Sequence, residues 1–214
     1  MRLIDKHRPT SYQNIVGNQK TIDRIYRAVD DNDGFGGLVI MLLGKTGNGK
    51  TLLADLIAKD INGDLYRPDC TKDAETGIAI DQARRDITQS NMFYNQSVYV
   101  FDEADKLHPN NIAKLKTMID SIDRRRQENL PCNVTVIFTS AKSKSQLTGT
   151  QQAHWDELCT RCITCKMDIL PQELDSYFAR LTGGRVQDIS RRITVRSMRA
   201  AWEYIEASDI DIVE

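Results

Sequence analysis

Two hydrophobic patterns alternate along most of the chain. Unbroken apolar runs, typical of strands buried on both faces, lie at residues 38–43 and 98–101. A further buried strand is predicted at residues 134–138, and short strands are expected near 64–67 and at 163–167. The segments between these runs place apolar residues at helical spacing, which predicts helices at residues 19–31, 50–60, 76–89 and 109–127. Strands that alternate with helices indicate βαβ units. We therefore predict an α/β fold in which a parallel sheet lies between two helical layers.

The two ends of the chain follow other patterns. Residues 1–18 are polar and irregular, whereas from Pro171 onward the pattern is helical only. Helices are predicted at residues 171–181, about 185–193 and about 195–206. We therefore predict an α/β core over residues 1–168, followed by a small all-helical unit over residues 169–214.

A glycine-bearing segment follows the first buried strand. Gly44–Thr51 matches the pattern G-x-x-x-x-G-K-[ST] in full, and a helix is predicted directly after it. Its glycines let the backbone N–H groups and the positive end of the helix face a bound phosphate chain. Lys50 can then reach the β- and γ-phosphates, and the Thr51 hydroxyl can bind Mg²⁺. We predict a P-loop NTPase fold that takes ATP and Mg²⁺, with nucleotide contacts from Thr46, Gly47, Asn48, Gly49, Lys50, Thr51 and Leu52.

Two adjacent carboxylates follow the strand at residues 98–101. Asp102 stands at the strand end, where a P-loop fold holds its Mg²⁺, and it is the predicted metal ligand together with Thr51. Glu103 is predicted to orient the attacking water and take its proton. Two such carboxylates in isolation would usually form a solvated turn. Behind a P-loop in a βαβ array, we favour the catalytic interpretation.

The next buried strand ends in hydroxyl side chains. In this topology it is expected beside the P-loop strand, so that a polar side chain at its tip can touch the γ-phosphate or the attacking water. We predict Ser140 as this catalytic residue, with Thr139 as the alternative. The competing interpretation is an ordinary strand end with two hydroxyls.

Three cysteines are clustered before the last strand. Cys159, Cys162 and Cys165 are spaced like three ligands of a zinc or iron–sulfur site, for which Cys70, Cys132 or His154 would be the fourth ligand. The segment also leads into a predicted buried strand, where cysteine is a common small apolar residue, and we favour that interpretation. The odd total of five cysteines argues against a disulfide framework and indicates a reducing compartment.

Charge and hydropathy exclude several classes of protein. A net charge of −1 argues against a domain that coats nucleic acid by charge alone, although local basic groups remain candidates for DNA contact. These groups are Arg84, Arg85, Arg124, Arg125, Arg126, Lys142 and Lys144, each of which is more often simply solvated. Because the chain has no apolar run of transmembrane length and no apolar stretch at its start, we expect a cytoplasmic protein that is neither secreted nor in a membrane.

Taken together, these motifs resemble the AAA+ ATPases, and among them the clamp-loader small subunits of the replication-factor-C kind. The resemblance covers roughly residues 5–195, and five stretches carry it. They are Lys6–Pro9 with Ile15–Gly17, the P-loop, Asp69–Ile78 with Arg84, Phe101–Asp105 continuing through Asn111 to Met118, and Cys159–Cys162. It implies that Arg8, Pro9, Val16 and Gly17 contact the nucleotide near its adenine. It also implies that Arg161 enters the ATP site of a neighbouring subunit.

The sequence departs from this family in its last part. The family's lid carries an arginine that contacts the γ-phosphate, and the segment Gly183–Asp188 is the expected counterpart, with Gln187 at the arginine position. With Gln187 at that position, Arg185, Arg191 or Arg192 would take the place of the lid arginine. The lid is expected to be short, and no counterpart of the family's collar domain is expected.

The resemblance implies a DNA-replication ATPase that assembles with other AAA+ subunits, as a homo- or hetero-oligomer. Such an assembly would load a sliding clamp or act on primer–template DNA. One alternative is a helicase loader or another AAA+ remodeller, and a second is a subunit that binds nucleotide for structure only. The intact set of Lys50, Thr51, Asp102 and Glu103 argues against the second alternative. The sequence predicts a single RecA-like domain, which argues against a D-E-A-D-box helicase, because such a helicase needs two.

Overall fold

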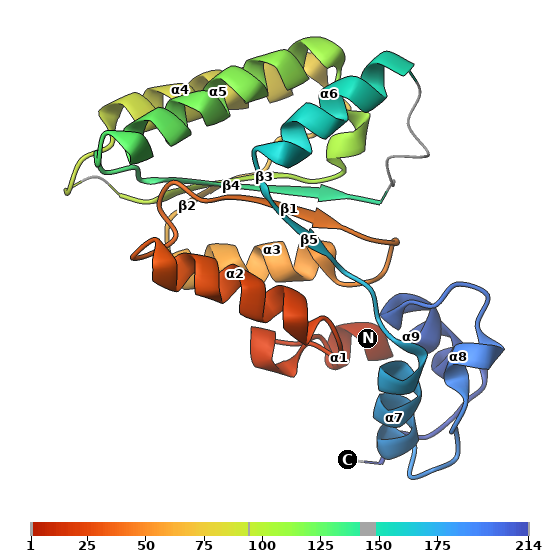
Figure 1. Cartoon of the computed structure of the whole chain (residues 1–214). Coiled ribbons are helices and arrows are strands. Elements are labelled where there is room, and N and C mark those ends of the chain that lie inside the picture. Colours follow the sequence, from red (N-terminus) through yellow and green to blue (C-terminus); the bar gives the residue numbers. More distant parts are fainter. Residues whose placement is uncertain (1, 94, 142–148, 214) are drawn as a thin grey trace.

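The computed structural model describes residues 2–93, 95–141 and 149–213, and this part of the chain contains one five-stranded sheet (Figure 1). The strands are β1 Val39–Leu43, β2 Asp64–Tyr66, β3 Ser97–Phe101, β4 Val134–Ser140 and β5 Ile163–Lys166. Their order in the sheet is β2-β3-β4-β1-β5, and every neighbouring pair is parallel. The predicted parallel α/β fold is therefore confirmed.

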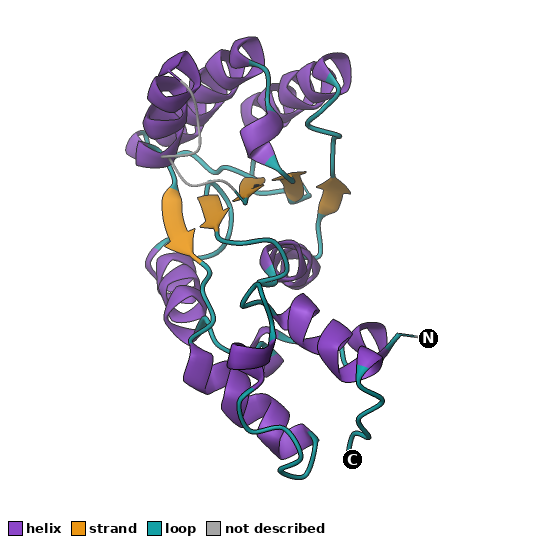
Figure 2. Cartoon of the chain, turned by 90° about the vertical axis from the view of Figure 1, so that its right-hand side faces the viewer, coloured by secondary structure: helices purple, strands orange, loops and turns teal. Residues whose placement is uncertain are grey.

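Helices cover both faces of this sheet. The helices α2 Gln19–Asp31 and α3 Lys50–Ile61 lie on one face, and α4 Asp73–Gln89, α5 Pro109–Gln127 and α6 Gly149–Thr160 lie on the other (Figure 1). Figure 2 shows the strands as one layer between the two sets of helices. Within the described residues, no helix has both the length and the apolar character that crossing a bilayer requires.

Successive side chains of β1 alternate between two hydrophobic cores. Val39 and Met41 belong to the core under α4 and α5, whereas Ile40 and Leu42 belong to the core under α2 and α3. This alternation follows from the two-residue repeat of a strand. Since both faces are covered by helices, the strand is apolar at every position, as its unbroken apolar run indicated.

The helix α5 shows why local sequence signals predicted its bounds. Its buried residues recur at helical spacing, and they are Asn111, Ile112, Leu115, Met118, Ile119 and Ile122. His108 caps its start by accepting a hydrogen bond from the Asn110 backbone at 3.3 Å, and Pro109 occupies the first helical position. Three arginines in the last turn complement the negative end of the helix.

The C-terminal helices form a separate small layer, which we call the lid. It consists of α7 Pro171–Leu181, α8 Ile189–Arg192 and α9 Met198–Ala207, and α8 is shorter than the predicted helix at 185–193. Their own core contains Phe178, Ile189 and Trp202, and the first residue of this cluster is Ile169. The lid lies beyond the carboxyl ends of the strands (Figure 1). The domain boundary after residue 168 stays a prediction.

The N-terminal segment is more ordered than its sequence predicted. It forms a short helix, α1 Leu3–Lys6, and a 3-10 turn at Tyr12–Asn14. Leu3 and Ile4 pack against the lid core, and the His7 ring stacks on Trp202 with ring centroids 5.0 Å apart and an interplanar angle of 11°. A helix of four residues shows no periodicity. Its order comes from this contact with α9, far away in the sequence.

The helix α6 was absent from the predicted elements. It packs on α5, and its residues Trp155 and Leu158 are buried in the core under α4 and α5. Glu157 on the same helix pairs with Lys116 of α5. Two buried anchors are too few to produce a clear helical pattern, so tertiary packing decides this element.

Candidate nucleotide site

A cavity of about 500 Å³ lies between the carboxyl ends of the strands and the lid. Parallel α/β sheets bind ligands at this edge, and the volume is in the range of small-molecule sites. Its wall contains the predicted contacts Arg8, Pro9, Val16, Thr46, Gly47, Asn48, Gly49, Lys50, Thr51, Leu52, Asp102 and Glu103. Folding thus brings together three segments that are far apart in the sequence.

The P-loop needs its glycines for two different reasons. At Gly44, a Cβ atom would lie 2.2 Å from the carbonyl oxygen of Met167, so that only glycine fits beside β5. At Gly47 and Gly49 the backbone is left-handed, with φ angles of +86° and +83°, which other residues rarely adopt. Directly after Gly49 the helix α3 begins, and its N-terminus faces the loop.

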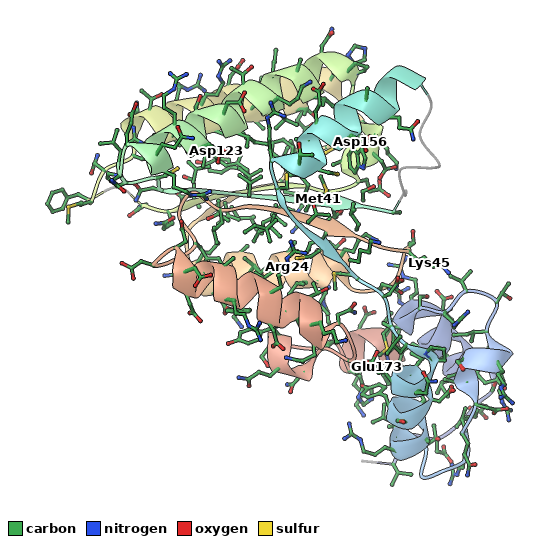
Figure 3. The ribbon with its side chains drawn as sticks, viewed as in Figure 1. Arg24, Met41, Lys45, Asp123, Asp156 and Glu173 are labelled. Atoms are coloured by element: carbon green, nitrogen blue, oxygen red, sulfur yellow. The ribbon has the colours of Figure 1, made fainter. Side chains whose placement is uncertain are left out.

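Lys50 is held by the loop that precedes it. Its ammonium donates to the carbonyl oxygens of Gly44 at 2.7 Å and of Lys45 at 2.9 Å, and the residue is only 8% exposed. Burial lowers the pKa of Lys50, while the nearby Asp102 carboxylate acts in the opposite direction. Figure 3 shows Lys45 in the loop that reaches toward the lid. A bound phosphate chain would supply the anionic partner that this buried cation lacks within its own loop.

The P-loop and the end of β3 meet at Thr51 and Asp102. The Thr51 hydroxyl lies 3.1 and 3.3 Å from the two carboxylate oxygens of Asp102. Thr139, at the end of the intervening strand β4, donates to Asp102 and accepts the backbone N–H of Glu103 at 3.1 Å. A hydroxyl and a carboxylate side by side are the oxygen ligands that Mg²⁺ prefers, and this donor set fits that metal.

The strand-end hydroxyl that faces the cavity is Thr139, which was the alternative, and not Ser140. Thr139 is part of the cavity wall, whereas Ser140 is fully buried and donates to Asp105 at 3.0 Å. The two side chains differ because adjacent residues of a strand point to opposite sides. A catalytic role for Ser140 stays a prediction, and it would have to act through Asp105.

Glu103 sits in a strained turn at the cavity wall. Its φ angle is +55°, a left-handed conformation that costs a residue other than glycine about 1 kcal/mol or more. Its carboxylate pairs with Lys106 three residues later, and the side chain is 59% exposed. Water can therefore reach this carboxylate, as a general base requires.

A lid arginine reaches the cavity from a position that the sequence interpretation missed. Arg199 lies in the first turn of α9 and lines the wall, and its Cβ is 3.0 Å from the point where a Cβ on Gly47 would be. The predicted lid segment Gly183–Asp188 does not line the wall, and Arg185 pairs instead with Asp211 at 2.8 Å. A sequence signal for this position is Ser197, which caps α9 by accepting a hydrogen bond from the Ala200 backbone at 3.2 Å. It marks the start of α9, and Arg199 lies in the first turn of that helix.

The other substitutes proposed for the lid arginine also lie away from the cavity wall. Arg192 pairs with Asp188 at 2.7 Å, and Arg191 is exposed in the last turn of α8. Both belong to a helix of four residues on the lid surface. Within the lid, Arg199 is thus the arginine that the described structure brings to the cavity.

The N-terminal segment closes the far end of the cavity. His7, Trp202 and Arg8 are in the wall, and the Arg8 guanidinium donates to Asp55 of α3 at 2.9 Å. The Nε2 atom of His7 is buried and has no hydrogen-bond partner among the described residues. A nucleotide base placed here could supply the missing partner.

Gly17, a predicted nucleotide contact, lies just outside the cavity wall. Its backbone is left-handed, with a φ angle of +69°, and a Cβ would come within 2.8 Å of the Glu173 carboxylate. Figure 3 shows Glu173 on α7. Gly17 therefore allows the lid to approach the core closely, and its contact with nucleotide stays a prediction.

The three clustered cysteines lie on opposite faces of the sheet. Cys159 and Cys162 pack against the core under α4 and α5, whereas Cys165 belongs to the core on the opposite face of the sheet. Among the described residues, no three side chains of His, Cys, Asp or Glu lie close enough together to hold a metal ion. The His154 side chain lies outside the described part of the structure. Burial raises the pKa of Cys159 to about 11, which disfavours the thiolate. The preferred interpretation as apolar filling agrees with this packing.

Arg161 lies away from the cavity of its own chain. It stands between α6 and β5 and is absent from the cavity wall. Its Nε donates to Asp120 of α5 at 2.9 Å, and its Nη1 donates to the Glu157 carbonyl oxygen at 3.0 Å. Within its own chain, this guanidinium is therefore not part of the cavity wall.

Several of the basic candidates for DNA contact have structural partners. Arg125 donates to the carbonyl oxygens of Pro131 at 2.8 Å and Ser90 at 2.7 Å, and Arg126 donates to that of Gly37 at 2.5 Å. These contacts hold loops at the end of α5. Arg85 donates to Gln82 on its own helix, Arg84 and Arg124 are exposed, and Lys142 and Lys144 lie outside the described residues.

Comparison with known proteins identifies the class of this site. The ATPase family associated with various cellular activities (AAA) matches residues 40–183, which run from β1 to the end of the lid helix α7. No curated protein matches the chain in sequence. The match covers more than half of the chain and includes the P-loop, Asp102 and Glu103.

Solved structures share the fold at low sequence identity. RuvB of Thermotoga maritima, a Holliday junction branch migration motor, superposes with a TM-score of 0.64 and 16% identity, over 97% of this chain and 69% of that one. A single-site mutant of the same protein gives a TM-score of 0.65 and 16% identity, over 98% and 70%. At 16% identity, the likeness to these structures shows a common fold. The family match covers the P-loop, Asp102 and Glu103 themselves. The chain belongs to the AAA family of ATPases.

Proposed function

We propose that this chain binds ATP with Mg²⁺ in the cavity and hydrolyses it within an assembly of AAA subunits. The proposal depends mainly on the contact of Thr51 with Asp102 at 3.1 Å, beside the buried ammonium of Lys50. Together these groups provide the phosphate and metal contacts that a P-loop ATPase needs. Thr51 and Asp102 would hold Mg²⁺, and the bound ion would offset negative charge on the β- and γ-phosphates.

The hydrolytic step assigns one task to each side chain. The oxygen of a water molecule bonds to the γ-phosphorus while the bond from that phosphorus to the leaving β-phosphate oxygen breaks. Glu103 takes the proton of the water. Lys50, after leaving its loop carbonyls, and Arg199 from the lid place positive charge where negative charge grows. The Thr139 hydroxyl holds the Asp102 carboxylate and the Glu103 backbone in place through its two hydrogen bonds.

Arg161 is the arginine that we assign to the ATP site of a neighbouring subunit. It lies away from its own cavity and is 32% exposed, so that a second chain can approach it. In the transition state it would add charge to the γ-phosphate of that chain, as arginine fingers do. The isolated subunit should therefore hydrolyse ATP slowly.

The first test of this function is Arg161→Ala. We expect unchanged ATP affinity and a loss of assembly-dependent turnover of about 1,000-fold, because the arginine contributes only to a neighbour's transition state. ATP binding and phosphate release are measured at increasing protein concentration, with the assembly mass followed in parallel. If the variant assembles and keeps the turnover of the wild-type chain, the role of Arg161 is wrong.

For the target of this ATPase, we propose a sliding clamp loaded onto primer–template DNA. An exposed apolar pair supports a protein target: Met92 and Phe93, between α4 and β3, are 87% and 97% exposed. This loop precedes β3 and so lies at the end of the sheet opposite the ATP cavity. Adjacent large apolar side chains in water favour burial by a partner protein. The clamp is the partner that the resemblance to clamp loaders implies.

A double variant, Met92→Ser with Phe93→Ser, separates this target from the ATP site. We expect it to lose stimulation of turnover by a candidate clamp, while basal turnover and stimulation by primed DNA are kept. Leu130→Ser is the matched control because Leu130 is also an exposed apolar loop residue, at 45%. Clamp stimulation that is equal in the double variant, the control and the wild-type chain contradicts the docking role.

The likeness to RuvB structures supports a second candidate, a motor that moves DNA. Turnover that is stimulated by four-way DNA junctions, but by neither primed DNA nor a clamp, would favour this candidate over clamp loading. A helicase loader predicts stimulation by a replicative helicase instead. A subunit that binds nucleotide for structure only predicts ATP binding without turnover in any assembly.

A further inference from the structure

The guanidinium of Arg161 is held by two neighbouring helices. Nε donates to an Asp120 carboxylate oxygen at 2.9 Å, and Nη1 donates to the Glu157 carbonyl oxygen at 3.0 Å. A guanidinium carries five N–H donors in one plane, so these two bonds leave three donors for other acceptors. Among the described residues, Nη2 has no hydrogen bond to the protein.

The two helices form a firm support. The helices α5 and α6 pack together, Trp155 and Leu158 bury α6 in the core, and Lys116 pairs with Glu157 across the contact. Figure 3 shows α5 and α6 side by side on the same face of the sheet. A contact made to such elements fixes the direction of a long side chain more than a contact to a loop does.

We propose that Asp120 is a positioning residue for Arg161, which it holds so that the unused N–H groups meet the triphosphate bound by a second copy of this chain. The inference rests on the proposed function, in which Arg161 acts on a neighbour's ATP. Without Asp120, the arginine keeps its charge but samples several rotamers. Ordering it then costs conformational entropy each time two subunits meet. Asp120 removes that cost in advance.

If Asp120 only stabilised the fold, its loss would lower the melting temperature. The Asp120 side chain is 53% exposed and that of Arg161 is 32% exposed, and ion pairs of this kind contribute little to folding. Loss of Asp120 should therefore leave the melting temperature unchanged. A positioning role appears in kcat of the assembled enzyme, while KM for ATP, which is set by the other chain's cavity, stays constant.

The test mixes two full-length variants, each of which lacks one half of the shared site. The acceptor carries Arg161→Ala and keeps its ATP cavity, whereas the donor carries Glu103→Gln and keeps its arginine. With the donor in excess, turnover reports only donor arginines in acceptor cavities. Adding Asp120→Asn to the donor should lower kcat about 10-fold at unchanged KM for ATP, since misplacing a catalytic group by a fraction of an ångström has effects of this size. Asp120→Glu should recover much of the loss.

Asp123→Asn in the donor is the matched control. Asp123 lies one turn further along α5 and pairs with Arg126 at 3.6 Å. Its charge also acts on Arg161, but it accepts no hydrogen bond from that guanidinium among the described residues, so its loss should leave the direction of Arg161 and the turnover unchanged. Sedimentation checks that all donors associate equally with the acceptor. If the Asp120→Asn donor is as active as the Asp123→Asn donor, the positioning role is overturned and the proposed function stands. If the donor that carries Glu103→Gln alone restores no turnover to the acceptor, the trans role of Arg161 fails, and the role of Asp120 fails with it.

Discussion

Lys50→Ala is expected to weaken ATP binding by at least about 100-fold, equivalent to about 2.7 kcal/mol. The Lys50 ammonium is buried beside the loop that would hold the phosphates, where a charge-assisted hydrogen bond is stronger than in water. Among the described residues of the free chain, the ammonium donates hydrogen bonds to the carbonyl oxygens of Gly44 and Lys45. A bound triphosphate would replace these neutral acceptors with anionic ones, so the lysine contributes much more to the complex than to the free protein.

The fold should tolerate the same change. Alanine is the best helix former, and removing the buried ammonium relieves a desolvation cost, which the lost attraction to the Asp102 carboxylate offsets in part. We therefore expect a melting temperature close to that of the wild-type chain. ATP affinity is measured by calorimetry on the full chain. Lys45→Ala is the matched control: it removes an exposed lysine from the same loop and should change affinity less than about 3-fold. Wild-type ATP affinity in the Lys50 variant would contradict the proposed phosphate site.

Glu103→Gln is expected to lower turnover by about 100- to 1,000-fold and to leave ATP binding intact. Glutamine has the size and most of the hydrogen bonds of glutamate, but it cannot accept the proton of the attacking water. The variant should therefore accumulate ATP-bound assemblies. Phosphate release at saturating ATP and the amount of bound ATP are measured on the same sample.

The pairing of Glu103 with Lys106 requires a separate control. Lys106→Ala removes the ion pair but keeps the carboxylate, and it should retain turnover within a few-fold of the wild-type chain because exposed pairs of this kind contribute little. Equal losses in both variants would indicate that the pair, and not the base, matters. Wild-type turnover in an assembled Glu103→Gln sample would remove Glu103 from the mechanism.

The candidate site could be predicted from sequence wherever its parts are local. Gly44–Thr51 carries its own geometry, because two left-handed glycines and the start of α3 are specified within eight residues. The Asp102–Glu103 pair is similarly marked by the strand directly before it. The strands β1 and β3 were predictable for a related reason, since strands buried on both faces leave unbroken apolar runs.

Contacts between distant segments were beyond the reach of such patterns. The choice of Thr139 over Ser140 depends on which of two adjacent side chains faces the cavity, and a one-residue difference inverts that choice. Arg199 was missed because the lid has short helices and irregular links, so the arginine nearest the P-loop depends on how α9 docks. The spacing of the cysteines suggested a cluster, but the sheet separates Cys165 from the other two.

The sequence alone determined the class of the protein: a P-loop, a buried strand that ends in two carboxylates and a parallel α/β sheet. These features depend on backbone conformation and on burial, both of which a few neighbouring residues specify. Only the tertiary structure decided which side chains complete the cavity, how α1 joins the lid through His7 and Trp202, and that Asp120 holds Arg161. Such contacts come from packing between elements far apart in the chain, and local patterns carry no record of that packing.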